Sequence, residues 1–114
     1  MDSSVRDNGL VSLYVETSAG YPFQSENVTM ADLMRAIKIA EDTEGIFTYT
    51  PMKANVSFVQ LFDFHDQACK VYLVLEEDEC VGEETYLSIE NAIGLVKSIC
   101  AGVTPDRTGW DELT

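Results

Sequence analysis

The chain has 114 residues, enough for one domain and too few for two. Hydrophobic residues make up 46% of it, which is within the range of folded domains and excludes a wholly disordered chain. Seven Lys and Arg face 20 Asp and Glu, and the resulting net charge of −13 disfavours binding to nucleic-acid backbones or anionic membranes while it attracts basic partners.

The first half of the chain predicts a strand followed by an amphipathic helix. Residues 9–17 (GLVSLYVET) alternate between two faces, one of them wholly apolar, which is the pattern of a strand with one buried face. At about 30–44, apolar residues recur at helical spacing with charged residues opposite them. Thr29 is suited to cap this helix, and Asp32 would complete an imperfect capping box, because Glu or Gln is the usual partner. Gly45 is expected as the glycine that ends the helix.

The second half predicts further strands and then a second helix. Runs of β-branched and aromatic residues predict strands at 46–50, 56–62 and 69–75. Because only six residues separate the last two, we expect an antiparallel hairpin with its turn at 63–68. Residues 76–84 (EEDECVGEE) are predicted as a charged loop, 85–87 as a short additional strand, and about 89–101 as a helix capped by Ser88.

This order of elements predicts an α+β fold. Strands grouped between two amphipathic helices are typical of a central antiparallel sheet, here of about four to five strands, with both helices packed on it. No internal repeat and no long linker divides the sequence. We therefore expect a single domain over 1–114, of which residues 1–8 are polar and expected to fray.

The cysteines and the N-terminal sequence indicate a cytoplasmic protein. Cys69, Cys80 and Cys100 are an odd number without a Cys-x-x-Cys pair, which favours neither a disulfide framework nor a zinc site. The start, MDSSVRDNG, lacks the apolar stretch of a signal peptide, and no apolar run reaches the ~18 residues of a transmembrane helix. We therefore expect the reducing environment of the cytoplasm.

Few residues of the sequence suit catalysis. A Ser-His-Asp or Cys-His device would have to use His65, the single histidine, whose neighbours Asp63, Asp66 and Cys69 match no known spacing of metal ligands. The acidic run lacks the alternating ligands and the glycine of an EF-hand loop, and the isolated glycines form no phosphate-binding loop. We therefore predict no catalytic residue, no cofactor and no metal site, and a protein that acts by binding another macromolecule.

The acidic loop is the strongest candidate for a binding surface. Its carboxylates are Glu76, Glu77, Asp78, Glu79, Glu83 and Glu84, and a second, smaller group consists of Asp63 and Asp66 in the hairpin turn. The strand 69–75 would separate the two groups, so they would form two sites unless only one of them binds. Two interpretations stay open: a solvated loop that aids solubility, or a docking surface that offers carboxylates where phosphates would lie in a basic cleft.

The C-terminal segment carries a family resemblance. The last predicted helix is followed by Gly102, then by Pro105, and five residues later by Trp110, the only tryptophan. This tail resembles that of immunity proteins from bacterial polymorphic-toxin systems, which end in a helix, a Gly-x-Arg-Pro turn and a tryptophan five residues after the proline. Thr104 stands here in place of the arginine. A structural interpretation is also open, in which Gly102 and Pro105 end the helix and Trp110 covers the core.

The resemblance implies a cytoplasmic inhibitor of a cognate toxin domain, often a nuclease or a nucleic-acid deaminase, which blocks the toxin's active site without chemistry of its own. Its partner would be a basic protein. Direct binding of nucleic acid, of a membrane or of a small-molecule substrate is not expected. Two alternatives fit the same acidity: a nucleic-acid mimic encoded by a phage or mobile element, and a structural or adaptor domain whose charge is incidental.

Overall fold

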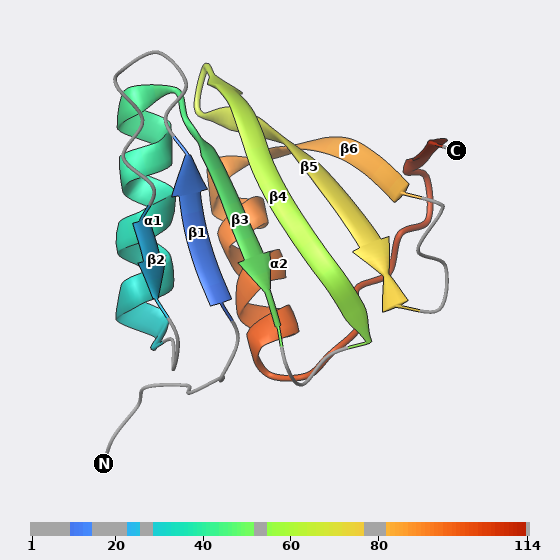
Figure 1. Cartoon of the computed structure of the whole chain (residues 1–114). Helices are drawn as coiled ribbons and strands as arrows, with labels where there is room; N and C mark the ends of the chain where they lie inside the picture. Colours follow the sequence, from blue (N-terminus) through green and yellow to red (C-terminus); the bar gives the residue numbers. More distant parts are fainter. Residues whose placement is uncertain (1–9, 15–22, 26–28, 52–54, 77–81, 114) are drawn as a thin grey trace.

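An antiparallel sheet with two helices on one of its faces forms the fold (Figure 1). The computed structural model describes residues 10–14, 23–25, 29–51, 55–76 and 82–113. In this part of the chain seven strands follow one another in the order β2-β1-β3-β4-β5-β6-β7, and every neighbouring pair is antiparallel. The predicted α+β class, with two helices on an antiparallel sheet, is therefore confirmed.

The five longer strands are those that the sequence predicts. They are β1 (Leu10–Tyr14), β3 (Ile46–Thr50), β4 (Val56–His65), β5 (Ala68–Leu75) and β6 (Gly82–Ser88). Two further strands of three residues each, β2 (Phe23–Ser25) and β7 (Asp111–Leu113), form the two edges of the sheet. Neither is predicted from the sequence, because three residues are too few for an alternating pattern to be recognised.

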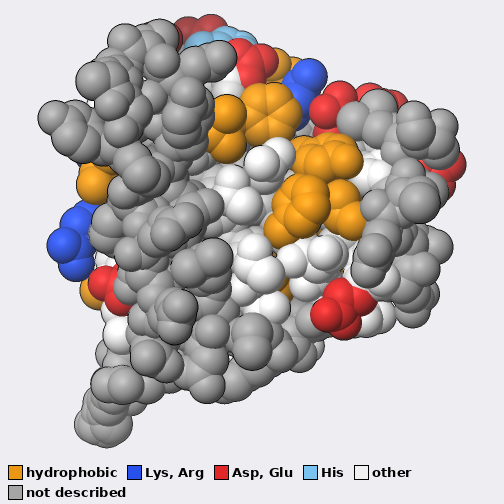
Figure 2. All heavy atoms as spheres, in the orientation of Figure 1, with side chains coloured by type: hydrophobic (Ala, Val, Ile, Leu, Met, Phe, Trp, Pro, Cys, Tyr) orange, Lys and Arg blue, Asp and Glu red, His pale blue; other side chains and the backbone are white. Residues whose placement is uncertain are grey.

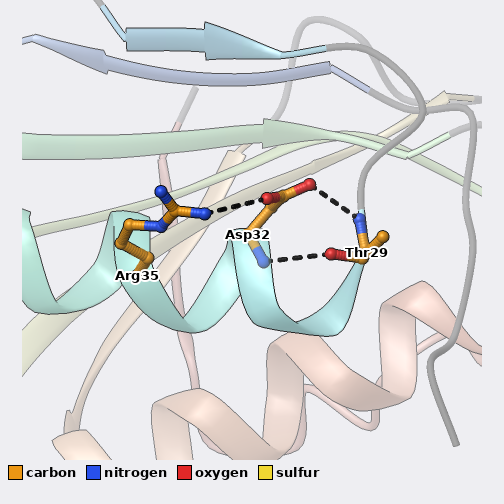
Figure 3. A network of polar contacts seen from close by, with 3 residues as sticks. All are labelled: Thr29, Asp32 and Arg35. Carbon is orange, nitrogen blue, oxygen red and sulfur yellow. Dashed lines mark hydrogen bonds and ion pairs between the residues drawn. The ribbon is translucent and has the colours of Figure 1, made fainter.

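The first helix, α1 (Met30–Thr43), begins at a complete capping box (Figure 3). The Asp32 amide donates to Thr29 Oγ1 at 3.2 Å, and the Thr29 amide donates to Asp32 Oδ2 at 3.1 Å. Arg35 Nη2 donates to the other oxygen of the Asp32 carboxylate at 3.4 Å and helps to hold it in place. The shorter Asp therefore completes a box that usually uses Glu or Gln.

The end of α1 corrects the expectation for Gly45. The residue in the left-handed conformation is Glu44, at φ 56° and ψ 40°. Gly45 comes one position later, is buried, and donates its amide to the Ala40 carbonyl at 2.9 Å. Gly45 is therefore not the left-handed residue of this helix end, and a glutamate adopts the conformation that glycine would adopt at lower cost.

The second helix, α2 (Ile89–Cys100), follows β6 without a loop. The Ser88 side chain accepts from the Asn91 amide at 3.1 Å, as expected of the predicted cap. At the other end Gly102 has a φ of 90°, and its amide donates to the Ile99 carbonyl at 2.9 Å. This left-handed backbone favours glycine and supports the predicted structural role of Gly102.

Both helices bury their apolar stripes against the same face of the sheet. The largest fully buried side chains in this core come from both helices and from β3, β4 and β5: Tyr49, Phe47, Leu33, Ile37, Leu61, Leu73 and Ile99. Within the described residues, neither helix combines the length and the apolar character that crossing a bilayer requires.

The β4–β5 hairpin is tighter than predicted. Its turn comprises only Asp66 and Gln67, at φ 50° and 60°, as in a two-residue turn of type I′. Asp63, which was expected in the turn, lies within β4 at φ 54°, where the pairing with β5 shifts register between Phe62 and His65. Such a bulge changes the direction of the side chains beside it, and Asp63 is the residue that it redirects.

Replacing Glu44 by Gly should raise the free energy of unfolding by about 1 kcal/mol, because glycine adopts the left-handed conformation without steric cost and removes an acid from the negative end of the helix. Urea denaturation measures the difference. Thr43→Gly is the control: Thr43 is helical, so glycine there should lower the free energy of unfolding by about 0.5 kcal/mol. A Glu44→Gly variant that is no more stable than the wild type would contradict this account of the helix end.

Candidate functional site

The edge formed by β6 and β7 gathers carboxylates from distant parts of the sequence. In the register of these strands Glu83 lies opposite Glu112, and Glu84 lies opposite Asp111. We call these four residues the acidic edge. Like charges directly opposite each other in a sheet repel and destabilise the pair. Asp111 and Glu112 are exposed, and they are not among the predicted binding residues, because nothing in the sequence indicates that the tail returns to β6.

Two basic side chains partly neutralise the acidic edge. Lys70 Nζ lies 3.6 Å from Glu84 Oε2, and Arg107 Nε lies 3.5 Å from Glu83 Oε2. The four side chains are 21–28% exposed, so these pairs are better shielded from solvent than ordinary surface pairs. Lys70 comes from β5 and Arg107 from the tail. Glu83 and Glu84 are therefore paired with basic residues that lie outside the acidic run 76–84 in the sequence.

The predicted acidic loop is shorter than expected. Glu76 is exposed directly after β5, whereas Glu83 and Glu84 belong to β6 and not to a loop. Glu77, Asp78 and Glu79 lie outside the described residues. The loop expected at 76–84 is therefore corrected at its C-terminal end, where regular pairing with β5 reaches back to Gly82.

The structure divides the second predicted group, Asp63 and Asp66. Asp66 is exposed in the hairpin turn, at the end of β5 opposite to Glu76. Asp63 lies at the bulge in β4, and its carboxylate Oδ2 accepts a hydrogen bond from the Tyr86 hydroxyl on β6. Asp66 and Glu76 therefore lie at opposite ends of β5, whereas Asp63 binds Tyr86, on which the charge of Glu84 also acts.

Polar and aromatic side chains surround the contact between Asp63 and Tyr86. The His65 ring meets the Tyr86 ring edge-on, with centroids 5.7 Å apart, and Lys70 Nζ lies 5.3 Å from the centroid of the Tyr86 ring. The hydrogen bond to Asp63, followed by desolvation and the negative charges of Asp63 and Glu84, raises the pKa of Tyr86. The carboxylate favours the protonated phenol, which can donate to it, over a phenolate that would repel it.

The described residues show little that would support catalysis. Within the described ranges, no group of three or more His, Cys, Asp or Glu is arranged to hold a metal ion. Burial and the negative charge of Glu41 raise the pKa of Cys69 to about 11, so this thiol stays protonated at neutral pH and packs as an apolar side chain. Cys80 lies outside the described residues. That the chain needs no metal or cofactor stays a prediction.

The C-terminal tail turns back from α2 and brings Trp110 to the core. Trp110 is partly buried and packs against the core residues of the sheet and helices. With Leu87, Leu95, Val103 and Pro105 it borders a surface hollow of about 590 Å³. The packing of Trp110 agrees with the structural role predicted for it, and the role of Pro105 stays a prediction.

Comparisons with models of known protein families, with curated proteins and with solved structures gave no match. The resemblance to immunity proteins therefore rests on the tail residues Gly102, Pro105 and Trp110. A function has to be argued from the charge and geometry of the described surface.

Replacing Asp63 by Asn should lower the pKa of Tyr86 toward its ordinary value of 10.0, because a neutral amide does not repel the phenolate. A pKa that is raised in the folded state stabilises the fold below the pKa of the unfolded chain, and this contribution is lost as pH rises through the folded pKa. The wild type should therefore lose more stability than Asp63→Asn in strongly alkaline solution.

Tyrosinate absorbance as a function of pH measures the pKa, and Tyr86→Phe identifies which of the five tyrosines in the chain gives the shifted transition. An unchanged Tyr86 transition in Asp63→Asn would contradict the role given to the carboxylate.

Truncation after Gly102 should lower the free energy of unfolding by about 2–4 kcal/mol, the usual scale for the loss of a large packed aromatic side chain. The shortened chain loses Trp110 together with β7. Thermal melting and urea denaturation measure the change, and Trp110→Ala in the full chain separates the side chain from the strand. A truncated protein that melts like the full chain but no longer binds its partner would assign Trp110 to the interface instead.

Proposed function

We propose that the protein is a small acidic inhibitor that binds a cationic protein domain, and that it serves as the immunity protein of a bacterial toxin such as a nuclease or a nucleic-acid deaminase. The observation that carries the proposal is the acidic edge, where carboxylates meet in like-charged pairs across two strands. In this proposal the inhibitor works by occluding the toxin's active site and performs no reaction itself.

The acidic edge opposes the stability of the fold. Its paired carboxylates repel each other, and Lys70 and Arg107 each contact only one member of a pair. A cationic surface bound at this edge would relieve the remaining repulsion. It would also be drawn to the edge at long range, which accelerates association. A charge arrangement that is unfavourable in the free protein is therefore favourable in the complex.

A toxin that acts on nucleic acids is the class of partner that suits this surface. Its active site has to bind phosphates through Lys and Arg side chains, and carboxylates held at the same positions would be attracted to the site and fill it. The similarity of the tail to immunity proteins, through Gly102, Pro105 and Trp110, favours a toxin over other cationic proteins.

The test is to express the C-terminal domain of the protein encoded by the neighbouring gene in a bacterial host, with and without this chain. The domain alone should stop growth, the chain should restore it, and the two purified proteins should form a complex. If growth is not restored, the proposal fails. If the neighbouring genes encode phage structural proteins and the chain displaces DNA from a DNA-binding protein, the nucleic-acid mimic replaces it.

The first four acids of the predicted acidic loop, at 76–79, should affect mainly the rate at which the protein associates with the toxin domain. Changing Glu76, Glu77, Asp78 and Glu79 to Gln or Asn should slow association with the toxin domain and flatten its dependence on salt, while the dissociation rate changes little. Stopped-flow mixing at several salt concentrations measures both. These four are preferred to Glu83 and Glu84, whose neutralisation would leave Arg107 and Lys70 without their ion pairs.

A matched control removes four negative charges from the helix layer by changing Glu41, Asp42, Glu44 and Glu90 in the same way. Because Glu41 and Asp42 are paired with Lys38 on the exposed side of α1, thermal melting first establishes that the control is folded. It should affect the association rate less than the variant at 76–79, because the helix layer is not the surface proposed to bind the toxin. Equal effects of the two variants would mean that the association rate depends only on the total charge of the protein and that residues 76–79 belong to a solvated loop.

A further inference from the structure

The face of the sheet turned away from the helices carries an apolar patch of its own. Val74 is only 4% exposed, yet it does not belong to the core between sheet and helices. It lies opposite Phe58 on β4 and opposite Gly82 on β6, and Tyr72 follows two residues away on the same face. Figure 2 looks onto this face and shows hydrophobic side chains gathered over the sheet, with acidic side chains near them. We call Phe58, Tyr72, Val74 and Gly82 the aromatic platform.

Tyr72 is the centre of the platform, because Gly82 leaves room for its ring. A β-carbon at position 82 would overlap the ring atoms of Tyr72, so glycine allows the ring to lie directly on the backbone of β6. The ring also contacts Phe58, with centroids 5.9 Å apart and planes inclined by 46°. Both rings are only partly buried, so the platform offers aromatic surface to a partner.

Carboxylates border the platform. Glu84 lies directly opposite Tyr72 in the pairing of β5 with β6, and Asp111 lies opposite Glu84 in the pairing of β6 with β7. Paired residues of antiparallel strands share a face, so both acids belong to the side away from the helices. Asp63, bound to Tyr86, adds a third carboxylate at the hairpin end of this face.

Lys70 demonstrates how this face holds a cation. Its Nζ lies 5.3 Å from the centroid of the Tyr86 ring and 3.6 Å from Glu84 Oε2, so an aromatic ring and a carboxylate act on one ammonium group. Tyr72 and Glu84 offer the same combination one step further along the sheet. In the described part of the chain, no basic side chain lies over the Tyr72 ring as Lys70 lies over Tyr86.

We propose that the aromatic platform is the docking surface for an arginine-bearing segment of a cationic protein partner, whose guanidinium stacks on Tyr72 and pairs with Glu84. The inference rests on the proposed function and names the surface through which it would act. Arginine fits better than lysine, because its planar guanidinium stacks on a ring while its N–H groups reach a carboxylate. Glu84 can accept from a second donor, since a carboxylate has more acceptor sites than Lys70 uses.

Charge complementarity selects a cationic protein as the occupant. The chain has a net charge of −13, and Asp63, Glu84 and Asp111 border the platform, with Lys70 already bound to one of them. A nucleic acid or a second copy of the chain would be repelled by these carboxylates. A neutral apolar partner would have to bury them without compensation, which is costly.

The probe is a blocked tetra-arginine peptide, and its control of equal charge is blocked tetra-lysine. In NMR titrations of the isotope-labelled protein at low salt, tetra-arginine should shift the amide signals of Tyr72, Glu84 and their neighbours on β5 and β6. It should also bind about two- to five-fold more tightly than tetra-lysine, the effect expected of one exposed stacking contact with a ring.

Variants of the platform separate the ring from the charge. Tyr72→Leu removes the ring and keeps the apolar bulk, so it should abolish the preference for arginine, whereas Tyr72→Phe keeps the ring and should keep the preference. Val103→Ser changes an apolar residue outside the platform that is 54% exposed, and it should alter neither affinity. Thermal melting establishes that each variant is folded before binding is compared.

The outcomes distinguish the docking surface from the proposed function. If the two peptides bind equally and the shifts follow Glu83, Asp111 and Glu112 but not Tyr72, the docking surface is wrong, while binding of a cationic partner through charge remains. If neither peptide binds more tightly than the negatively charged tetra-glutamate, both the docking surface and the proposed function are overturned.

Discussion

The packing of both helices on one face of the sheet is the constraint on which the rest of the structure depends. The side chains of β4 and β5 that point toward the helices are fully or almost fully buried in this core: Val59, Leu61, Val71 and Leu73. Because side chains alternate along a strand, the residues between them have to face away from the helices. Burying one face of the sheet in the core therefore leaves a second face, and packing of the core does not determine which residues that face carries. Tyr72, Lys70 and Tyr86 lie on that face, free to serve another purpose.

The charge of the chain is also distributed by the topology of the sheet. Residues that are remote in sequence become neighbours because β6 is paired with β5 on one side and with β7 on the other. Lys70 and Arg107 reach the acidic edge from these two directions, and Asp111 and Glu112 add to its charge. The edge that results is neither neutral nor uniformly charged. It combines shielded ion pairs with exposed carboxylates, which is the pattern of a surface that can attract a cationic partner.

Much of the fold could be predicted from the sequence, because its long elements have clear periodicity. Both helices lie within a residue or two of their expected bounds, and the five longer strands were all indicated by alternation or by β-branched and aromatic runs. Features that depend on pairing between distant segments could not be predicted. β7 has three residues and no pattern, so the charge pairs between β6 and β7 could not be inferred from local sequence. The tight turn at Asp66 could not be inferred either, because it depends on the register of β4 against β5, which shifts between Phe62 and His65.

The tail that resembles immunity proteins has a physical meaning in this fold. Gly102 ends α2 with a left-handed turn, and Trp110 packs its ring on the core immediately before β7 begins. The residue packed on the core therefore directly precedes the strand that places Asp111 and Glu112 opposite β6. Residues that look purely structural would in this way determine where the charge lies. The same tail thus contributes Trp110 to the packing of the core and Asp111 and Glu112 to the acidic edge.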